Sequence, residues 1–253
     1  MVAPGGLWGE FVVVPQTTST NAHVAEAAHR GAAEGLVVAA EYQSRGRGRL
    51  DRGWHSPPGA GLTFSVLLRP QEVPSNRWPW LPLLAGVVVV EATTRLAAVE
   101  AGLKWPNDVL VGGRKLAGIL LERVGGSTAA AVLGVGVNVT TTARELVEPT
   151  ATSLLLEGAM TDDREAILCA VLRTLEESYG RWRSAGGDPD ASRLRAAYES
   201  RSVTLGREVR VELPGRTWLT GTARAVDEVG RLVVRDVTGR DPAVAAGDVI
   251  HLR

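Results

Sequence analysis

Arginine and glycine alternate in one short stretch of the chain, residues 41–54. Its sequence is Glu-Tyr-Gln-Ser-Arg-Gly-Arg-Gly-Arg-Leu-Asp-Arg-Gly-Trp, and it follows an apolar run at 36–40 that is typical of a buried strand. Glycine lets the backbone approach a ligand closely, and arginine presents a planar, permanently charged fork to carboxylate and phosphate oxygens. The pattern predicts a loop that closes over an anion, although a solvated basic turn has the same local sequence.

Lysine is rare in this chain, and its two occurrences lie close together. Of the 28 basic residues, all except Lys104 and Lys115 are arginine. The ammonium group is a compact point charge, unlike the planar guanidinium. Its restriction to residues 103–122 marks that segment as a second candidate for chemistry.

Two β-rich runs within residues 103–122 flank Gly112-Gly113, a sequence typical of a two-residue hairpin turn. Because side chains alternate along a strand, we expect Asp108 and Lys115 to project from the same face. A surface ion pair that contributes little stability is the alternative interpretation. The expected cross-strand pairs are Val111 with Arg114, Leu110 with Lys115, and Val109 with Leu116.

A third β-rich run, residues 127–139, follows Gly125-Gly126. With a connecting loop of even length, this run presents two glycines and an asparagine to the face that carries Lys115, and the glycines form a floor on which a flat ligand could lie. A loop of odd length would turn the third strand over. The even register places Gly136 opposite Lys115, Gly134 opposite Ala117, and Asn138 diagonal to Lys115.

Ser19-Thr20-Asn21 precede an amphipathic pattern that extends to about Arg30 and is typical of a helix. Thr18 or Ser19 could cap it. A helix start with three small polar side chains also suits a neutral polar ligand or a carboxylate. Capping alone and ligand binding are both open at this point.

Longer patterns predict an α+β fold with a mixed, mainly antiparallel sheet and helices packed on one of its faces. The polar segment 140–149 is expected to be a mobile loop beside the site. Short strands beyond residue 201 favour a small five-stranded SH3-like barrel, so we expect a catalytic domain at 1–201 and a barrel domain at 202–253. The expected helices are 76–101, 162–183 and 189–201, and the expected barrel strands are 203–205, 208–213, 217–225, 231–236 and 243–252.

Composition narrows the function. Acidic and basic residues both number 28, so no net field attracts nucleic acid or an anionic membrane. The single cysteine, Cys169, excludes an intrachain disulfide, and no Cys/His spacing suggests zinc. The longest apolar run, 83–90, is too short to span a bilayer, and a cytoplasmic location is expected.

The candidate residues favour phosphoryl or nucleotidyl transfer over hydrolysis. No Ser-His-Asp, Cys-His or paired-carboxylate arrangement accompanies them in the sequence. Fixed cations act on phosphates by positioning them and stabilising their charge, and Asp108 could help to hold Mg²⁺. Neither a Walker A motif nor a Rossmann fingerprint is present.

These motifs resemble those of the biotin–protein ligase family, and the resemblance covers essentially the whole chain. The family's arginine loop, Gly-Arg-Gly-Arg-x-x-Arg-x-Trp, matches residues 46–54. Its other motifs match in order: Ser-Thr-Asn at 19–21, Lys-Trp-Pro-Asn-Asp at 104–108, Lys-Leu-Ala-Gly-Ile-Leu at 115–120 and Gly-x-Gly-x-Asn at 134–138. The resemblance implies a class II synthetase-like catalytic domain followed by the small barrel.

The resemblance also implies a two-step reaction with ATP, Mg²⁺ and biotin. The biotin carboxylate attacks the α-phosphorus of ATP to give biotinyl-5′-AMP and pyrophosphate, and a lysine of an apo biotin carboxyl carrier protein of an acyl-CoA carboxylase then takes the biotinyl group. Lipoate–protein ligase and a non-catalytic biotin-binding module are the alternatives. We expect a monomer or weak homodimer that binds neither nucleic acid nor membrane.

Family motifs assign roles to individual residues. Lys115 is the expected main catalytic cation, because an ammonium that touches two anions removes their repulsion. Arg49, Arg52 and Asp108 are expected to assist it, whereas Lys104 is open between a catalytic and a supporting role. The residues expected to bind biotin are Ser19, Thr20, Asn21, Gln43, Gly46, Arg47, Gly48, Arg49, Lys115, Gly118 and Leu120. The residues expected to bind ATP are Arg49, Arg52, Trp54, Asn107, Lys115, Asn138 and Arg253.

Two departures from the family pattern carry expectations of their own. Asp51 stands in the arginine loop where many relatives have glycine, and an acidic residue there is expected to alter loop closure. Some relatives carry an N-terminal winged-helix DNA-binding domain, whereas only a short segment precedes the first expected strand here, so no operator binding is expected.

Overall fold

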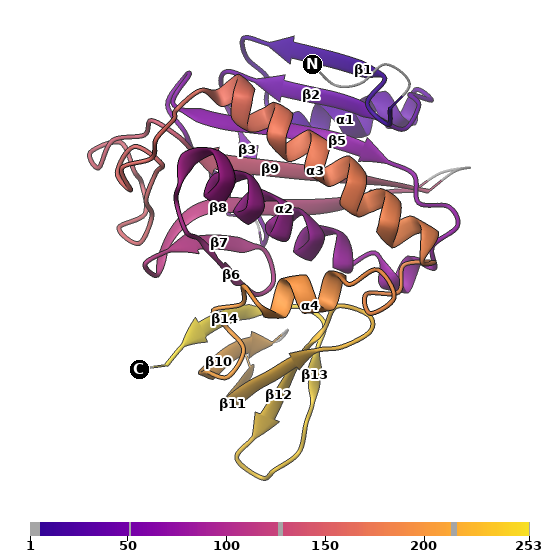
Figure 1. The fold of residues 1–253 in the computed structure, drawn as a ribbon, viewed down its shortest axis with the longest axis vertical. Helices are drawn as coiled ribbons and strands as arrows, with labels where there is room; N and C mark the ends of the chain where they lie inside the picture. Colours follow the sequence, from indigo (N-terminus) through magenta and orange to yellow (C-terminus); the bar gives the residue numbers. More distant parts are fainter. Residues whose placement is uncertain (1–5, 51, 126–128, 214–216, 253) are drawn as a thin grey trace.

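The computed structural model describes residues 6–50, 52–125, 129–213 and 217–252. A seven-stranded sheet forms the larger part of the molecule, and a five-stranded C-terminal sheet lies below it in Figure 1. The order of the large sheet is β1-β2-β5-β9-β8-β7-β6; β1 and β2 pair in parallel and the other neighbours are antiparallel. Its strands are β1 (Glu10–Val14), β2 (Leu36–Ala40), β5 (Gly61–Leu68), β6 (Gly102–Lys104), β7 (Asp108–Val111), β8 (Arg114–Val124) and β9 (Ala130–Asn138).

The two central strands, β5 and β9, are buried at every residue. Their nearly continuous apolar sequences are typical of strands that are covered on both faces. Phe64 and Leu133 belong to the main hydrophobic core on one face. Leu67 and Val132, of opposite parity, belong to a smaller apolar cluster on the other face. The sheet therefore separates two packed layers.

Helices cover both faces of this sheet. α2 (Trp80–Ala97) and α3 (Arg164–Ser184) lie across the face that carries the main core (Figure 1). α1 (Thr20–His29) packs on the opposite face, where its Val24 and Ala28 complete the smaller cluster. The expectation that helices pack on one face thus holds for α2 and α3 but not for α1. The short helices are η1 (Ser75–Arg77) and α4 (Leu194–Glu199).

Among the described residues, α2 is the one helix long and apolar enough to cross a membrane by length and composition. In the structure 72% of its residues are buried inside the protein. Most of its surface therefore packs against the sheet and against α3. α2 is a core helix, as the density of apolar residues in its sequence suggests.

The C-terminal sheet has the order β13-β12-β11-β10-β14. It is built from β10 (Glu208–Leu213), β11 (Thr217–Val226), β12 (Leu232–Asp236), β13 (Ala243–Val244) and β14 (Asp248–His251). The strands differ from the expected ones in two places, which together leave their number unchanged. Residues 203–205 do not form a strand, and the expected strand 243–252 is divided into β13 and β14. The expected five strands are present, and the domain boundary at 201/202 remains a prediction.

Two tryptophans from the larger part of the molecule attach the C-terminal sheet. Trp80 Nε1 donates to the carbonyl oxygen of Glu228 at 3.2 Å, and Trp105 Nε1 donates to that of Gly230 at 3.1 Å. Both acceptors belong to the turn between β11 and β12. Since the two indoles are buried, these hydrogen bonds fix the position of the C-terminal sheet relative to the site.

The register of β7, β8 and β9 differs from the expected one in two places. Leu110 pairs with Lys115 as expected, but Val109 pairs with Ala117, so Leu116 is an extra, bulged residue. The loop between β8 and β9 has odd length, because Val124 pairs with Ala130. The expected pairings of Val109, Gly134 and Gly136 are therefore wrong. The observed pairs are Val109 with Ala117, Gly136 with Gly118, and Gly134 with Leu120.

The two register errors cancel when one asks which residues lie on the face of the sheet that carries Lys115. A bulge and an odd-length loop each reverse the parity of the residues that follow. As a result, Lys115 still shares a face with Gly118, Gly134 and Gly136. The methylene Cε of Lys115 lies only 3.3 Å from the position that a Cβ on Gly118 would take.

Candidate active site

A cleft of about 490 Å³ lies on the face of the sheet that carries Lys115. Arg253 and Asp51 lie outside the described residues, so the expectations for them are not tested by the structure. Gly46, the first residue of the arginine hairpin, is buried and does not line the cleft. The cleft brings together all the other expected site residues, namely Ser19, Thr20, Asn21, Gln43, Arg47, Gly48, Arg49, Arg52, Trp54, Asn107, Asp108, Lys115, Gly118, Leu120 and Asn138.

The arginine loop is a small hairpin. β3 (Gly46–Arg47) pairs with β4 (Gly53–Trp54), and the amide of Gly48 donates to the carbonyl of Arg52 at 2.7 Å. A Cβ on Gly46 would lie 2.4 Å from the carbonyl oxygen of Trp54, so glycine is required for the strands to approach. The glycines thus shape the hairpin, and the arginines project from it.

A polar network occupies the end of the cleft next to α1. The side-chain oxygen of Gln43 accepts from the backbone amide of Thr20 at 2.7 Å and from its hydroxyl at 3.1 Å. Ser65 Oγ donates to Asn21 Oδ1 at 2.6 Å and lies at hydrogen-bond distance, 2.7 Å, from the hydroxyl oxygen of Thr20. Ser19 makes no capping hydrogen bond. The expected local cap is therefore replaced by Gln43, which reaches the helix from another segment.

Asn21 and Trp54 cover the glycine floor. A Cβ on Gly134 would lie 2.1 Å from Asn21 Oδ1, and a Cβ on Gly136 would lie 2.4 Å from Trp54 Cε2. The expected flat surface exists, but the protein's own amide and indole lie on it. The indole Nε1 of Trp54 is buried and has no hydrogen-bond partner among the described residues, which leaves a donor available inside the cleft.

Three of the cations in the cleft are paired with carboxylates. Arg47 contacts Glu122 at 3.2 Å, and Lys115 Nζ lies 2.7 Å from Asp108 Oδ1. Asp108 Oδ1 nevertheless lacks a well-aligned hydrogen bond, so the contact with Lys115 is an ion pair by distance only. The third pair joins Arg52 to Asp248 of β14, and so links the arginine loop to the C-terminal sheet.

Arg49 and Lys104 have no carboxylate within ion-pair distance in the part of the chain that the structure describes. Arg49 donates to Asn107 Oδ1 at 3.2 Å and to the carbonyl of Gly247 at 3.4 Å, both neutral acceptors. Burial is the main cause that lowers the pKa of Arg49 and of Lys104, and Asp108 opposes it in each case. Within the described residues, the cleft therefore holds two partly buried cations without an ion-pair partner, which favours the binding of anions.

The segment 146–151 forms one wall of the cleft, so the end of the expected loop 140–149 lies beside the site; its lining residues are Leu146, Val147, Glu148, Thr150 and Ala151. The amide of Lys115 donates to the carbonyl of Thr150 at 2.7 Å, and the amide of Thr152 donates to the carbonyl of Lys115 at 2.8 Å. Asn138 Nδ2 donates to the carbonyl of Thr152 at 2.9 Å. Asn138 therefore holds this wall in place, and its expected contact with adenosine stays a prediction.

Sequence reasoning missed two acidic residues of the cleft region, Glu122 and Asp248. Neither belongs to a motif with a recognisable spacing. Their partners, Arg47 and Arg52, lie far away in the chain, so no local pattern could have identified the pairs. Asp248 also shows that the C-terminal sheet contributes directly to the cleft.

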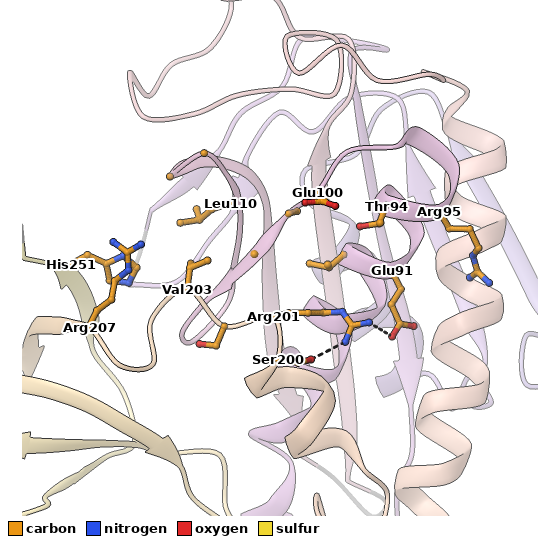
Figure 2. A pocket seen from close by; sticks show the side chains of 16 residues that line it. Glu91, Thr94, Arg95, Glu100, Leu110, Ser200, Arg201, Val203, Arg207 and His251 are labelled. Atoms are coloured by element: carbon orange, nitrogen blue, oxygen red, sulfur yellow. Dashed lines mark hydrogen bonds and ion pairs between the residues drawn. The ribbon is translucent and has the colours of Figure 1, made fainter.

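A second, more open groove of about 910 Å³ lies between α2, the β6–β7 hairpin and the C-terminal sheet. Figure 2 shows Arg207 and His251 at one end and Arg201 against Glu91 in its middle. Arg201 is held there by Glu91 at 3.0 Å and by Ser200 at 3.3 Å. The groove contains no residue of the arginine loop, and we place the chemistry in the cleft.

Comparison with known proteins identifies the family. The family model described as "Biotin/lipoate A/B protein ligase family" matches residues 12–138, and the model "Biotin protein ligase C terminal domain" matches residues 204–252. The chain is 47% identical to the biotin–[acetyl-CoA-carboxylase] ligase of Mycobacterium tuberculosis, with 100% of this chain and 93% of that protein covered. The chain belongs to the biotin protein ligase family.

Other members of the ligase family support this placement. The chain is 32% identical to the bifunctional ligase/repressor BirA of Escherichia coli, covering 89% of this chain and 69% of that protein. A solved structure of the biotin protein ligase from Aquifex aeolicus in complex with biotin and ATP is similar, with a TM-score of 0.79 and 28% identity over 97% of this chain and 100% of that chain. The family assignment made from the motifs is confirmed.

Proposed function

We propose that this protein is an ATP-dependent biotin–protein ligase. It activates biotin to biotinyl-5′-AMP and transfers the biotinyl group to a lysine of a biotin carboxyl carrier protein. The name of the Mycobacterium tuberculosis relative, a biotin–[acetyl-CoA-carboxylase] ligase, supports this substrate and a carboxylase carrier. The complex of the Aquifex aeolicus ligase with biotin and ATP supports the two small substrates.

The observation that carries the proposal is the division of the cleft into a polar end and a cationic end. The hydroxyl and amide groups of Thr20, Asn21 and Gln43 lie at one end and suit an uncharged polar group such as the ureido group of biotin. Arg49, Lys104 and Lys115 lie at the other end and suit a carboxylate and phosphates. A molecule with a neutral polar head and a terminal carboxylate matches this arrangement.

In the first step a carboxylate oxygen of biotin attacks the α-phosphorus of ATP. A carbon–oxygen–phosphorus anhydride forms while the bond from the α-phosphorus to the bridging oxygen breaks, and pyrophosphate leaves. We propose that Lys115 contacts both anions and that Arg49, which has no carboxylate within ion-pair distance among the described residues, supplies further positive charge. Bringing two anions together requires such fixed positive charge, and preorganised cations lower the barrier without reorganisation.

The donors of the cleft fit a metal ion that is carried mainly by the nucleotide. Mg²⁺ bound to ATP takes one or two protein carboxylates and fills its other positions with phosphate oxygens and water. Asp108 would supply a carboxylate and Asn107 an amide oxygen. The described residues contain no group of three or more His, Cys, Asp or Glu that would form a protein cage. The metal would neutralise phosphate charge.

In the second step the amine of the carrier lysine attacks the carbonyl carbon of biotinyl-5′-AMP. The new amide bond forms as the carbon–oxygen bond to the phosphate breaks, AMP leaves, and one proton is released from the nitrogen. The cleft that holds the first step must therefore stay open to a protein side chain. We propose that the carrier is a biotin carboxyl carrier protein, that the ligase is cytoplasmic, and that it does not bind nucleic acid.

One experiment tests the function against its alternatives. Purified protein is mixed with ATP, Mg²⁺, an apo biotin-carrier domain and either biotin or lipoate, and the carrier is then weighed by mass spectrometry. The carrier is expected to gain the mass of one biotinyl group in the mixture with biotin and to gain no mass in the mixture with lipoate. A gain with lipoate alone would contradict the proposed substrate. Pyrophosphate release that requires both ATP and biotin separates an enzyme from a module that binds biotin without turnover.

A further inference from the structure

Glu122 on β8 contacts two separate parts of the site at once. Its Oε1 lies 3.2 Å from Arg47 Nη1, and its Oε2 accepts from Arg47 Nη2 at 3.2 Å, so the carboxylate and the guanidinium meet through two parallel contacts. The same Oε2 accepts from Asn21 Nδ2 at 2.7 Å. One carboxylate therefore joins the arginine loop to the first turn of α1 on the face of the sheet that carries the cleft.

Glu122 at 2.7 Å, together with the more distant carbonyl oxygen of Leu120 at 3.4 Å, determines which way the amide of Asn21 points. Because Nδ2 donates to Glu122, Oδ1 is left to accept from Ser65 at 2.6 Å and to lie over Gly134. A carboxylate accepts hydrogen bonds and cannot donate them. An ionised Glu122 thus excludes the flipped amide, in which Oδ1 would face a carboxylate oxygen.

Glu122 also makes two arginines of the loop differ, because it pairs with Arg47 and not with Arg49. Arg47 is neutralised at the polar end of the cleft, whereas Arg49 keeps its charge at the anionic end. Without Glu122, Arg47 would be a third cation without a counter-ion, free to move towards the anion. The two-contact geometry with Arg47 favours a fixed side chain over a mobile one.

We propose that Glu122 is a positioning residue for the biotin end of the site. It holds the arginine hairpin against the sheet before substrate arrives and fixes the orientation of the Asn21 amide that receives the ligand. Its action is indirect, through Arg47 and Asn21. The part of this proposal that concerns biotin rests on the proposed function, whereas the part that concerns the hairpin does not.

The kinetic test uses Glu122→Gln, which keeps the shape of the side chain and an oxygen for Asn21 but removes the charge that Arg47 requires. We expect the KM for biotin to rise about threefold to tenfold, the effect of weakening one partly exposed ion pair and one hydrogen bond. The kcat and the KM for ATP are expected to change by less than about twofold, because the variant loses an interaction that stabilises bound biotin equally in the ground state and in the transition state. Arg47→Gln combined with Glu122→Gln should raise the KM for biotin by less than the product of the two single changes, because the two residues share one contact.

The structural test needs no activity. Amide hydrogen exchange of the ligand-free protein is expected to become faster over residues 46–53 in Glu122→Gln and to stay unchanged in β5 and β9. The matched control is Glu72→Gln. It removes a surface ion pair in which Glu72 lies 2.8 Å from Arg183, at a distance from the cleft. Both hydrogen exchange and kinetics should stay as in the wild type.

Two results would overturn the proposal. The first is unchanged exchange over 46–53 in Glu122→Gln, which would show that the hairpin does not depend on this carboxylate. The second is a fall in kcat with the KM for biotin unchanged, which would place Glu122 in the chemical step. If the wild type fails to biotinylate any carrier, the proposed function fails by itself, and hydrogen exchange still decides whether Glu122 holds the hairpin.

Discussion

The ammonium group of Lys115 lies 2.7 Å from Oδ1 of Asp108, although Asp108 pairs across the strands with Gly118 and not with Lys115. Asp108 and Leu110 lie on the same face of β7, and Leu110 pairs with Lys115, so the contact between Asp108 and Lys115 runs diagonally across the hairpin. Asp108 therefore holds the Lys115 side chain over the glycine floor, and any anion that binds Lys115 has to compete with this carboxylate.

Replacement of Lys115 by alanine is expected to abolish most of the adenylation step. Removing one preorganised charge from a transition state typically reduces the rate by about 10²–10³-fold. Lys115 is only partly buried, so the variant should remain folded. The measurement is biotin-dependent pyrophosphate release. Arg114→Ala is the control, because Arg114 is the preceding residue and pairs with Glu157. Near-normal release by Lys115→Ala would contradict the assigned role.

A methyl group added at each glycine of the floor is expected to affect a different substrate. Gly134→Ala should displace Asn21 and raise the KM for biotin, and Gly136→Ala should displace Trp54 and raise the KM for ATP. Misplacing a substrate contact by about 1 Å can cost about 10²-fold, so a change of at least tenfold is expected. Gly180→Ala on α3, where a Cβ would meet nothing within 4 Å, is the control. If both variants raised the KM for biotin and the KM for ATP equally, the assignment of biotin and ATP to different ends of the cleft would be wrong.

Loss of the indole hydrogen bond at Trp105 should weaken the attachment of the C-terminal sheet. Trp105→Phe leaves the carbonyl of Gly230 without its donor and is expected to lower the free energy of unfolding by about 1–3 kcal/mol. Denaturant unfolding measures this change. Trp218→Phe is the matched control, since Trp218 is 47% exposed and Trp105 only 2%. A Trp105→Phe protein as stable as the control would show that this contact is dispensable.

The imidazole of His251 predicts a dependence of stability on pH. Burial, followed by the charges of Lys104 and Arg207, lowers its pKa from 6.5 to about 4. Between these values the unfolded chain binds a proton that the folded protein does not, so this group makes stability fall as the pH falls from 6.5 towards 4. His251→Gln, which can still contact Thr204, should reduce that slope. The exposed His29→Gln variant should not, and a slope unchanged in His251→Gln would contradict the pKa.

Local chemistry made several features of this protein predictable. The Gly112-Gly113 turn, the start of α1, the long helices and the arginine loop all follow from turn residues, periodicity and charge within short windows. The pairing of Leu110 with Lys115 is correct because a two-residue turn determines its nearest pairs. The kinds of side chain in the site, cations and small polar groups, were visible in residue types alone, whereas their arrangement at two ends of one cleft was not.

Contacts between distant segments could not be read from the chain. Gln43 caps α1, Glu122 pairs with Arg47, and Asp248 pairs with Arg52, and such partners are chosen by the fold without any local signal. The bulge at Leu116 and the odd loop before β9 each reverse which face a side chain takes, and turn sequences do not specify them. Sequence therefore determined which groups are available for the chemistry, and tertiary structure decided which of them face each other, because facing depends on the sum of all insertions and on partners remote in the chain.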